Sequence, residues 1–271
     1  IDPDDYGVFA KSASDTTKVT TLANDTIIVD DAVIAGSDAT NIGIYAESGR
    51  TANSAPAQAS VEVLIDKDNS ITVKDTADGQ ADGGGAIVAV NSGLGTGGVK
   101  VATGDNLAIS VTGDATAGIF ATAAQGLPPV LGGAGKGAGD VSVTLTTGAI
   151  NVIGVDGVDA TGNLPGSIGV GAFSAGGAIS ITNAATNITV TENSATLRTV
   201  GVSGATTGAG SVTELLNGGT ITSNNGDGAS AIAVDGNIKV ILAGGTINAL
   251  NTGGAPAADG DGIFASIQDD P

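Results

Sequence analysis

A four-residue motif, glycine–apolar–aromatic–alanine, recurs along this chain and constrains its fold more than any other feature. Weaker copies lack the aromatic residue, the glycine or the final alanine. A unit that recurs every 30 to 53 residues is typical of a protein that stacks one small structural unit on the next. The third residues of the copies, taken as equivalent, are Phe9, Tyr45, Val88, Phe120, Phe173, Ser203, Ala233 and Phe264.

Two further segments recur between these motifs, always in the same order. The first alternates apolar with polar or small residues, and the second centres on an isoleucine that Thr, Asn or Ser usually follows. Alternation over a few residues, bounded by Gly, Asn and Asp, predicts a β-strand. The first segment is marked by Val61/Val63, Val99/Val101, Val141/Val143, Ile179/Ile181 and Ile238/Val240, with weaker versions at Val19 and Val212. The second is marked by Ile27, Ile71, Ile109, Ile150, Ile188, Ile221 and Ile247.

Three short strands per repeat predict an all-β fold, a right-handed parallel β-helix (β-solenoid) of about seven to eight rungs. Rungs stack at the spacing of paired strands, about 4.8 Å, so equivalent residues of successive repeats lie one above another. We expect the recurring isoleucine to form an inward ladder, and the recurring Phe or Tyr to form a second, interrupted ladder in the core or on its flank. Residues 1–271 are expected to form a single β-helix domain, a fragment of a longer protein.

The composition excludes several classes of function. The chain has no Cys and no His, so it lacks the usual ligands of zinc, haem and iron–sulfur sites and the base of most nucleophilic enzymes. A formal charge of -19 argues against nucleic acid as a partner. No apolar run approaches the ~20 residues that span a bilayer, so no direct membrane span is expected. Because 41% of the residues are hydrophobic and only 14% are charged, the chain is expected to be ordered.

The chain is rich in carboxylates, but their positions in the sequence do not predict a catalytic site. A glycosidase needs two facing carboxylates, and a lyase needs a base. Close pairs such as Asp30/Asp31 and Asp156/Asp159 lie at strand ends or in glycine-rich turns, where Asp is favoured for its turn hydrogen bonds. We therefore predict no catalytic residue and no enzyme, with a polysaccharide-processing β-helix enzyme as an alternative.

Calcium is the one metal that the residue types suit, because it binds oxygen ligands. The segment 66–69 begins like a calcium-binding loop but lacks the later glycine and glutamate, and the segments 224–228 and 258–262 serve equally well as bare turns. We expect no cofactor, with a weakly bound Ca²⁺ as the alternative. The candidate ligands are Asp66, Asp68, Asp227, Asp259 and Asp261.

Three copies of the motif extend into a longer pattern. They are Gly7-Val8-Phe9-Ala10-Lys11-Ser12, Gly43-Ile44-Tyr45-Ala46-Glu47-Ser48 and Asp261-Gly262-Ile263-Phe264-Ala265-Ser266. This pattern resembles the Gly-Ile-Tyr/Phe-Ala-x-Ser repeats of large autotransporter (type V secretion) passengers of Gram-negative bacteria. The resemblance implies a secreted β-helical passenger that is exported through a C-terminal outer-membrane barrel. The absence of Cys fits this route, because a disulfide formed in the periplasm could obstruct threading.

The resemblance leads us to expect a non-enzymatic extracellular or cell-surface protein, an adhesin or stalk segment that mediates attachment or cell–cell aggregation. Its partner would be a protein or glycan on a host or neighbouring cell, contacted through the long connections 47–60 and 122–140. The alternative is a structural filament or matrix protein that forms homo-oligomers or assembles end to end, since uncapped ends of a β-helix expose unpaired strand edges.

Overall fold

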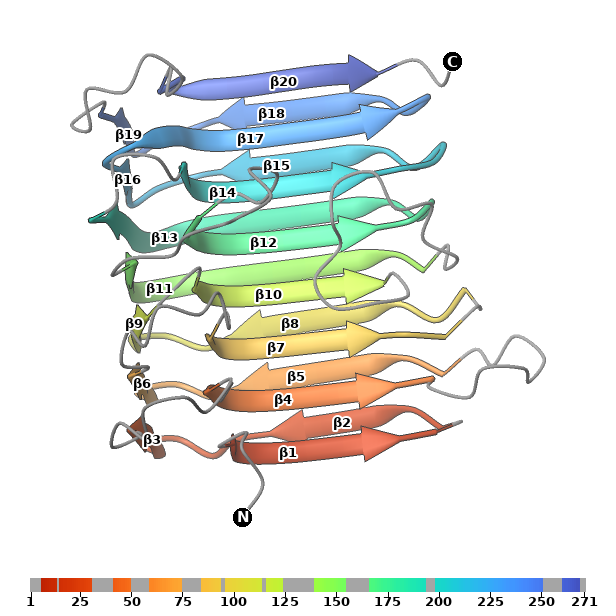
Figure 1. The fold of residues 1–271 in the computed structure, drawn as a ribbon, viewed down its shortest axis with the longest axis vertical. Helices are drawn as coiled ribbons and strands as arrows, with labels where there is room; N and C mark the ends of the chain where they lie inside the picture. Colours follow the sequence, from red (N-terminus) through yellow and green to blue (C-terminus); the bar gives the residue numbers. More distant parts are fainter. Residues whose placement is uncertain are drawn as a thin grey trace.

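The computed structural model describes residues 6–13, 15–30, 41–49, 59–74, 84–93, 96–113, 116–123, 139–154, 166–193, 198–250 and 260–268. Within these ranges the chain forms parallel β-strands and no helix (Figure 1). The strands belong to two sheets, of eight and of twelve strands. The prediction of an all-β fold with parallel strands is therefore confirmed.

The eight-stranded sheet forms the first side of the molecule. Its neighbouring strands are separated in the sequence by strands of the other sheet, so the chain leaves this side and returns to it repeatedly. In order, its strands are β1 (Tyr6–Ser12), β4 (Ile42–Ser48), β7 (Gly85–Asn91), β10 (Ala117–Ala123), β12 (Ile168–Ser174), β14 (Thr199–Thr206), β17 (Gly226–Val234) and β20 (Ile263–Gln268).

The twelve-stranded sheet forms two further sides, which the long strands β11 (Val141–Gly154) and β13 (Ile179–Glu192) join by running along both. The second side contains β2 (Thr17–Thr20), β5 (Val61–Ile65), β8 (Val99–Thr103), β15 (Val212–Leu216) and β18 (Ile238–Leu242) with the first parts of the long strands. The third side contains β3 (Thr26–Asp30), β6 (Ser70–Lys74), β9 (Leu107–Gly113), β16 (Thr220–Ser223) and β19 (Thr246–Ala249) with their last parts.

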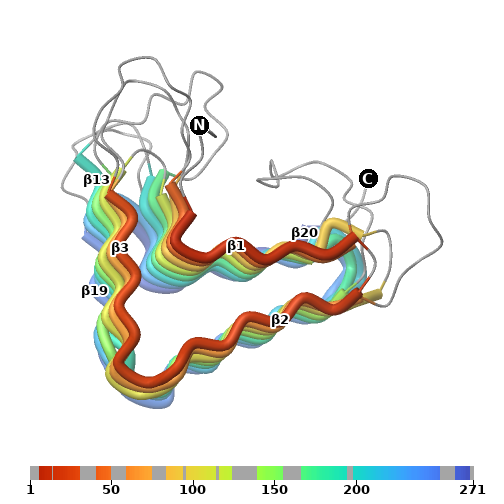
Figure 2. Tube along the Cα trace, turned by 90° about the horizontal axis from the view of Figure 1, so that it is seen from below, coloured from red at the N-terminus to blue at the C-terminus, as the bar shows by residue number. Residues whose placement is uncertain are grey.

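A view along the stack shows how the three sides enclose the core (Figure 2). The first and second sides lie against each other, and the third side meets them at an angle. One continuous cluster of buried Val, Ile, Leu and Ala fills the space between the sides. Because each rung adds only small and branched residues, the core needs no large aromatic side chain.

The predicted isoleucine ladder is confirmed on the third side. Each isoleucine pairs in register with the equivalent residue of the next rung, and the ladder is Ile27, Ile71, Ile109, Ile150, Ile188, Ile221 and Ile247. On the second side the predicted alternating segments form a similar inward column. One member of this column, Glu214, is not aliphatic.

Serines in the column of Ser48 close the connection between the first and second sides. Ser266, which ends the third extended copy of the motif, lies instead in the column of Glu47. The hydroxyl of Ser48 donates to the backbone oxygen of Asp15 (2.6 Å), and that of Ser174 donates to the oxygen of Gly139 (2.9 Å). Asn91 occupies the equivalent position and donates to the oxygen of Ala59. A small polar residue is therefore favoured here because it satisfies backbone groups where the chain reverses.

Two of the weaker motif copies are in a different register from the one predicted. Phe120 pairs with Gly171, whereas Phe173 pairs with Thr122, so Phe173 is not the equivalent of Phe120. Likewise Ser230, and not Ala233, lies between Ser203 and Phe264. The predicted equivalences of Phe173 and Ala233 are wrong. The aromatic position lies outside the core, so a small residue can replace the ring there and the ring does not fix the register.

Candidate functional site

The aromatic residues lie on the outer surface of the first side. Ile44 and Ala46 of β4 belong to the main core, so Tyr45 between them points outward. Tyr45 packs with Ile42, Val88 and Val90 in a small cluster that is separate from the main core. A second outer cluster surrounds Phe173, and Phe120 packs against both clusters. The aromatic ladder is thus on the flank of the coil.

Three rings gather at one end of this surface. Phe9 stacks on Tyr45 with ring centres 5.4 Å apart and ring planes 6° from parallel. Tyr6 meets Phe9 edge-on, with ring centres 5.0 Å apart. Phe9 remains 53% exposed. We call Tyr6, Phe9 and Tyr45 the aromatic platform.

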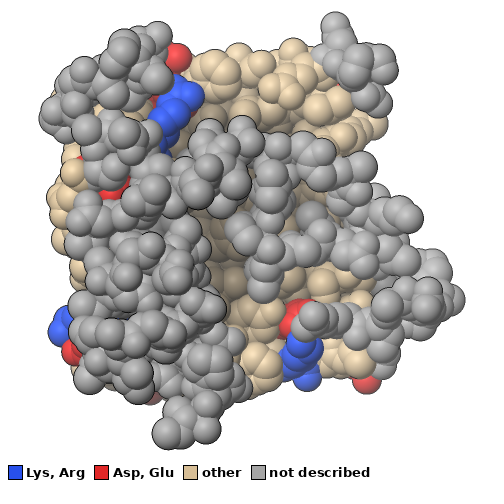
Figure 3. Space-filling view, viewed as in Figure 1, with Lys and Arg blue, Asp and Glu red and all other residues tan. Residues whose placement is uncertain are grey.

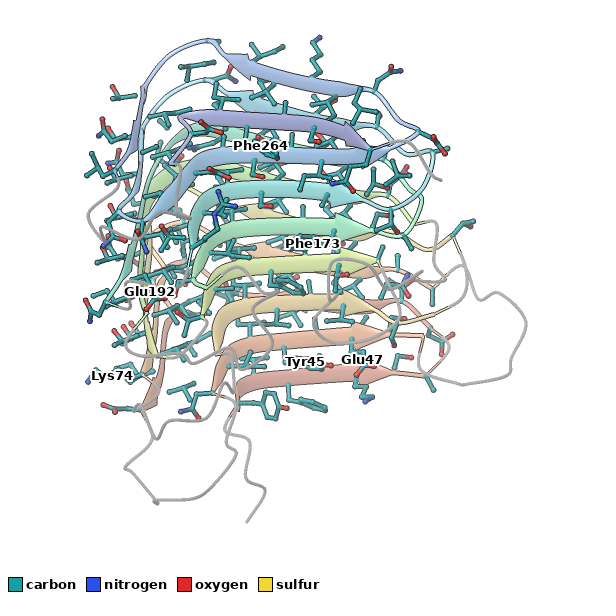
Figure 4. All side chains as sticks on the ribbon, turned by 45° about the horizontal axis from the view of Figure 1, so that its top comes forward. Tyr45, Glu47, Lys74, Phe173, Glu192 and Phe264 are labelled. Carbon is teal, nitrogen blue, oxygen red and sulfur yellow. The ribbon has the colours of Figure 1, made fainter. Side chains whose placement is uncertain are left out.

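A charged network adjoins the aromatic platform. The buried carboxylate of Glu47 accepts hydrogen bonds from the hydroxyls of Tyr45 and Ser92, both at 2.9 Å, and forms a 2.7 Å ion pair with Lys11. Figure 4 places Tyr45 and Glu47 on neighbouring positions of the same sheet. Burial alone would raise the pKa of Glu47, but the hydrogen bonds from Lys11, Ser92 and Tyr45 outweigh it and lower that pKa. Glu47 is therefore an ionised, positioned carboxylate at neutral pH.

On the side of the molecule that Figure 3 shows, the acidic and basic side chains of the described residues stand in a few small groups. The predicted contact connections lie largely outside the described residues, since 50–58 and 124–138 are not among them.

The first two calcium candidates lie in the turn between β5 and β6. Asp68 has a left-handed backbone (φ 58°), which Asp tolerates better than most residues. Its carboxylate accepts a hydrogen bond from the side-chain amide of Asn106 (2.9 Å), and the carboxylate of Asp66 accepts one from the backbone N–H of Lys67 (2.8 Å). Both residues thus have a role in shaping the turn.

Two other candidates meet at the far end of the stack. The carboxylate of Asp227, on β17, accepts a hydrogen bond from the backbone N–H of Asp261 (3.2 Å) and lies 3.9 Å from the guanidinium of Arg198. Burial raises the pKa of Asp227. The structure therefore brings Asp227 and Asp261 together, in rungs remote from Asp66 and Asp68. Asp259 lies outside the described residues.

A site for a metal needs more ligands than these pairs. Among the residues that the structure describes, no group of three or more Asp, Glu, His or Cys comes together.

One charged residue, Glu214 on β15, belongs to none of the clusters that the sequence marks as candidate sites. Its side chain is 0% exposed, and within the described part of the chain neither carboxyl oxygen has a hydrogen-bond partner. The signal was present: Val212, Glu214 and Leu216 alternate with outward residues, so the alternation itself predicts that Glu214 points inward.

Comparison of the chain with protein-family models, with curated proteins and with solved structures finds no match. No helix capable of crossing a membrane is present in the described ranges.

Proposed function

We propose that this chain is a segment of an extracellular bacterial surface protein, an adhesin or stalk segment of an autotransporter passenger. It mediates attachment or cell–cell aggregation and performs no catalysis. A right-handed coil of about seven to eight rungs forms one elongated scaffold. The partner is a protein or glycan on the surface of a host or neighbouring cell.

The observation that carries this proposal is the position of the aromatic rings. The coil buries its own core with aliphatic side chains, so the rings of the aromatic platform are not needed to close it. A half-exposed ring beside positioned polar groups is the composition that binding surfaces favour, since aromatic side chains supply large contact area at low entropic cost. Phe9 provides the ring, and the Lys11–Glu47 pair provides the polar groups.

The repeat also suits a projecting scaffold. Each rung contacts only its neighbours, so rungs can be added without changing those already present. Connections between strands can then vary in length and carry recognition. This supports a role in presenting a contact surface at a distance from the cell.

The experiment measures adhesion directly. Fluorescent beads coated with the full chain are added to epithelial cells and to Gram-negative bacterial cells, and bound beads are counted. We expect binding that Phe9→Ser reduces severalfold. The matched control is Leu22→Ser, because Leu22 is an exposed apolar residue (72%) outside the first side. Beads that bind neither cell type, or equal binding by the Phe9→Ser variant, would overturn the proposal.

One observation favours the filament alternative. The terminal strands β1 and β20 carry Phe9 and Phe264 in the same outward column, and Ile263 and Ile267 of β20 are exposed. Unpaired strand edges with apolar side chains pair readily with other chains. Electron microscopy of the purified chain separates the two functions. Filaments with an axial repeat near the length of one molecule support assembly, and isolated rods at high concentration contradict it.

A further inference from the structure

Glu214 occupies a place that is aliphatic in every other rung. It pairs in register with Ile181 of β13 and with Val240 of β18. Continuing through the earlier rungs, the column contains Val143, Val101, Val63 and Val19. A carboxyl group therefore lies in the inward ladder of the second side, inside the coil.

The first side of the coil also departs from the repeat pattern in this rung. Gly204 of β14 lies in a column that holds alanine at its other positions, including Ala172 and Ala231. A β-carbon at Gly204 would lie 2.8 Å from Cγ1 of Val212 and 3.2 Å from Oε1 of Glu214, so the glycine accommodates both side chains of β15. The missing methyl group thus leaves room for the carboxyl. A longer polar residue on one side and a smaller residue on the other form a matched pair of substitutions within the repeat.

The side chains around Glu214 offer nothing that stabilises a negative charge. Four strands pack against β15, namely β13, β14, β17 and β18. Their inward residues nearest the carboxyl in the pairing are Ile181, Gly204, Ala231 and Val240, and none is titratable.

The charged residues of those strands lie elsewhere. They are Glu192 at the end of β13, Asp227 near the start of β17 and Lys239, which is exposed on β18; β14 has none. Burial therefore raises the pKa of Glu214 to about 8. The backbone of Gly204 opposes this rise in part, without a hydrogen bond of ordinary geometry.

We propose that Glu214 makes the coil sensitive to pH: its protonated carboxyl packs beside Gly204 and keeps the rung closed, and release of the proton to solvent loosens β15 from its neighbours. A buried carboxylate without a partner is costly, so the strand must open to admit water or a cation once the proton is lost. This pH response is independent of the proposed adhesive function, because it requires only the packing around Glu214 in this rung.

The sign of the effect follows from linkage. The folded state binds the Glu214 proton more tightly than the unfolded state, so its contribution to stability is complete below about pH 4.5 and is lost as the pH rises through about 8. Carboxylates that are ionised in both the folded and the unfolded state add nothing to the slope in the neutral to alkaline range. Asp227, whose pKa burial also raises, contributes equally to the parent chain and to variants of Glu214.

The test compares the full chain with Glu214→Gln, which keeps the size of the side chain and removes its charge. Thermal melting is followed between pH 6 and pH 9.5, and hydrogen exchange of residues 207–219 is measured at the same pH values, corrected for the intrinsic exchange rate. We expect the melting temperature of the parent chain to fall by on the order of 10 °C across this range. The variant should show a nearly flat profile. Exchange in 207–219 should rise only in the parent chain.

A second variant, Glu214→Ile with Gly204→Ala, restores the repeat of the other rungs and provides the same test if Glu214→Gln folds poorly. It should also be flat with pH. Infrared spectra at pH 7 give a direct readout, since the carbonyl stretch of a protonated carboxyl should be present in the parent chain and absent from both variants. Equal pH dependence in the parent and a folded variant, or no protonated carboxyl at pH 7, would overturn the proposal.

Discussion

The Cγ2 methyl of Ile71 lies 2.6 Å from the position that a β-carbon on Gly43 would occupy. The backbone oxygen of Ala86 in the next rung is equally close (2.6 Å), so the glycine of the motif is required because the isoleucine of the third side and the neighbouring strand fill the space beside it. The same relationship recurs between Gly118 and Ile150. Ala86 is the exception in the glycine column, so the rung can adjust to one methyl group but has little room for more.

The first prediction concerns this contact. Gly43→Val should lower the free energy of unfolding by about 2–3 kcal/mol, because overpacking a filled core forces side chains from their preferred rotamers. Gly262→Val is the matched control: it lies in the same column, and nothing lies within 4 Å of its added β-carbon among the described residues. Urea unfolding of both variants tests the prediction. An equal loss of stability in both variants would show that strand propensity, and not the contact with the isoleucine, is the reason for the effect of the substitution.

The second prediction concerns the composition of the rung at β15. The double variant Glu214→Ile with Gly204→Ala should be more stable than the parent chain at pH 7 by about 1–3 kcal/mol, because it removes an unpaired buried polar group. Glu214→Ile alone should gain less, since the space beside Gly204 would be left partly empty. Urea unfolding of the parent, the two single variants and the double variant measures the coupling. Additive effects would mean that the two positions are not a matched pair.

The sequence predicts the inward residues well and the outward ones poorly. Ile109 and Ile150 can be aligned from the sequence, because each must lie above the isoleucine of the previous rung in a filled core. This requirement keeps an isoleucine at the same place in each repeat. Phe173 was misaligned because an outward ring has no fixed partner and can move two residues along its strand without disturbing the core. Hydrophobic periodicity therefore fixes the register only where both neighbours are buried.

The candidate sites likewise differ in how well the sequence predicts them. The acidic residues that the sequence singled out, such as Asp68, stand out because they cluster, and clusters of Asp are common in turns. Glu214 belongs to no such cluster, because it is a single residue in a weak copy of the repeat. Its importance depends on what packs around it, which requires the register of three strands to be known. Likewise, the network of Lys11, Glu47 and Ser92 joins residues from different rungs and has no signature within one repeat.

The third prediction concerns the ion pair beside the aromatic platform. Lys11→Met should destabilise the chain at pH 7 by about 1–2 kcal/mol, because it leaves the buried Glu47 carboxylate without its counter-ion. The pKa of Glu47 is lowered in the folded state, so its contribution is present above about pH 4.5 and is lost as the pH falls. The cost of the substitution should therefore shrink on acidification. Melting curves between pH 7 and pH 3 test this, and a cost that does not change with pH would contradict it.

The fourth prediction concerns a salt-bridge ladder on the second side. Glu62 pairs with Lys18 (2.9 Å) below it and Lys100 (3.0 Å) above it, and these hydrogen-bonded lysines lower the pKa of Glu62. Both lysines are more than half exposed, so Glu62→Gln should cost less than about 1 kcal/mol. The cost should disappear in molar NaCl, where exposed pairs are screened. Urea unfolding at two salt concentrations measures it, and a salt-independent loss would point to packing of the Glu62 stem.

The fifth prediction concerns calcium at the turn between β5 and β6. Asp66 and Asp68 each accept a hydrogen bond from the protein, and Asp68 holds the left-handed residue of the turn. We expect millimolar Ca²⁺, followed by excess EGTA, to leave the melting temperature unchanged. Asp68→Asn should be neutral because Asn also tolerates the left-handed conformation, whereas Asp68→Val should cost about 1–2 kcal/mol. Stabilisation by Ca²⁺ that Asp68→Asn abolishes would instead assign this turn to metal binding.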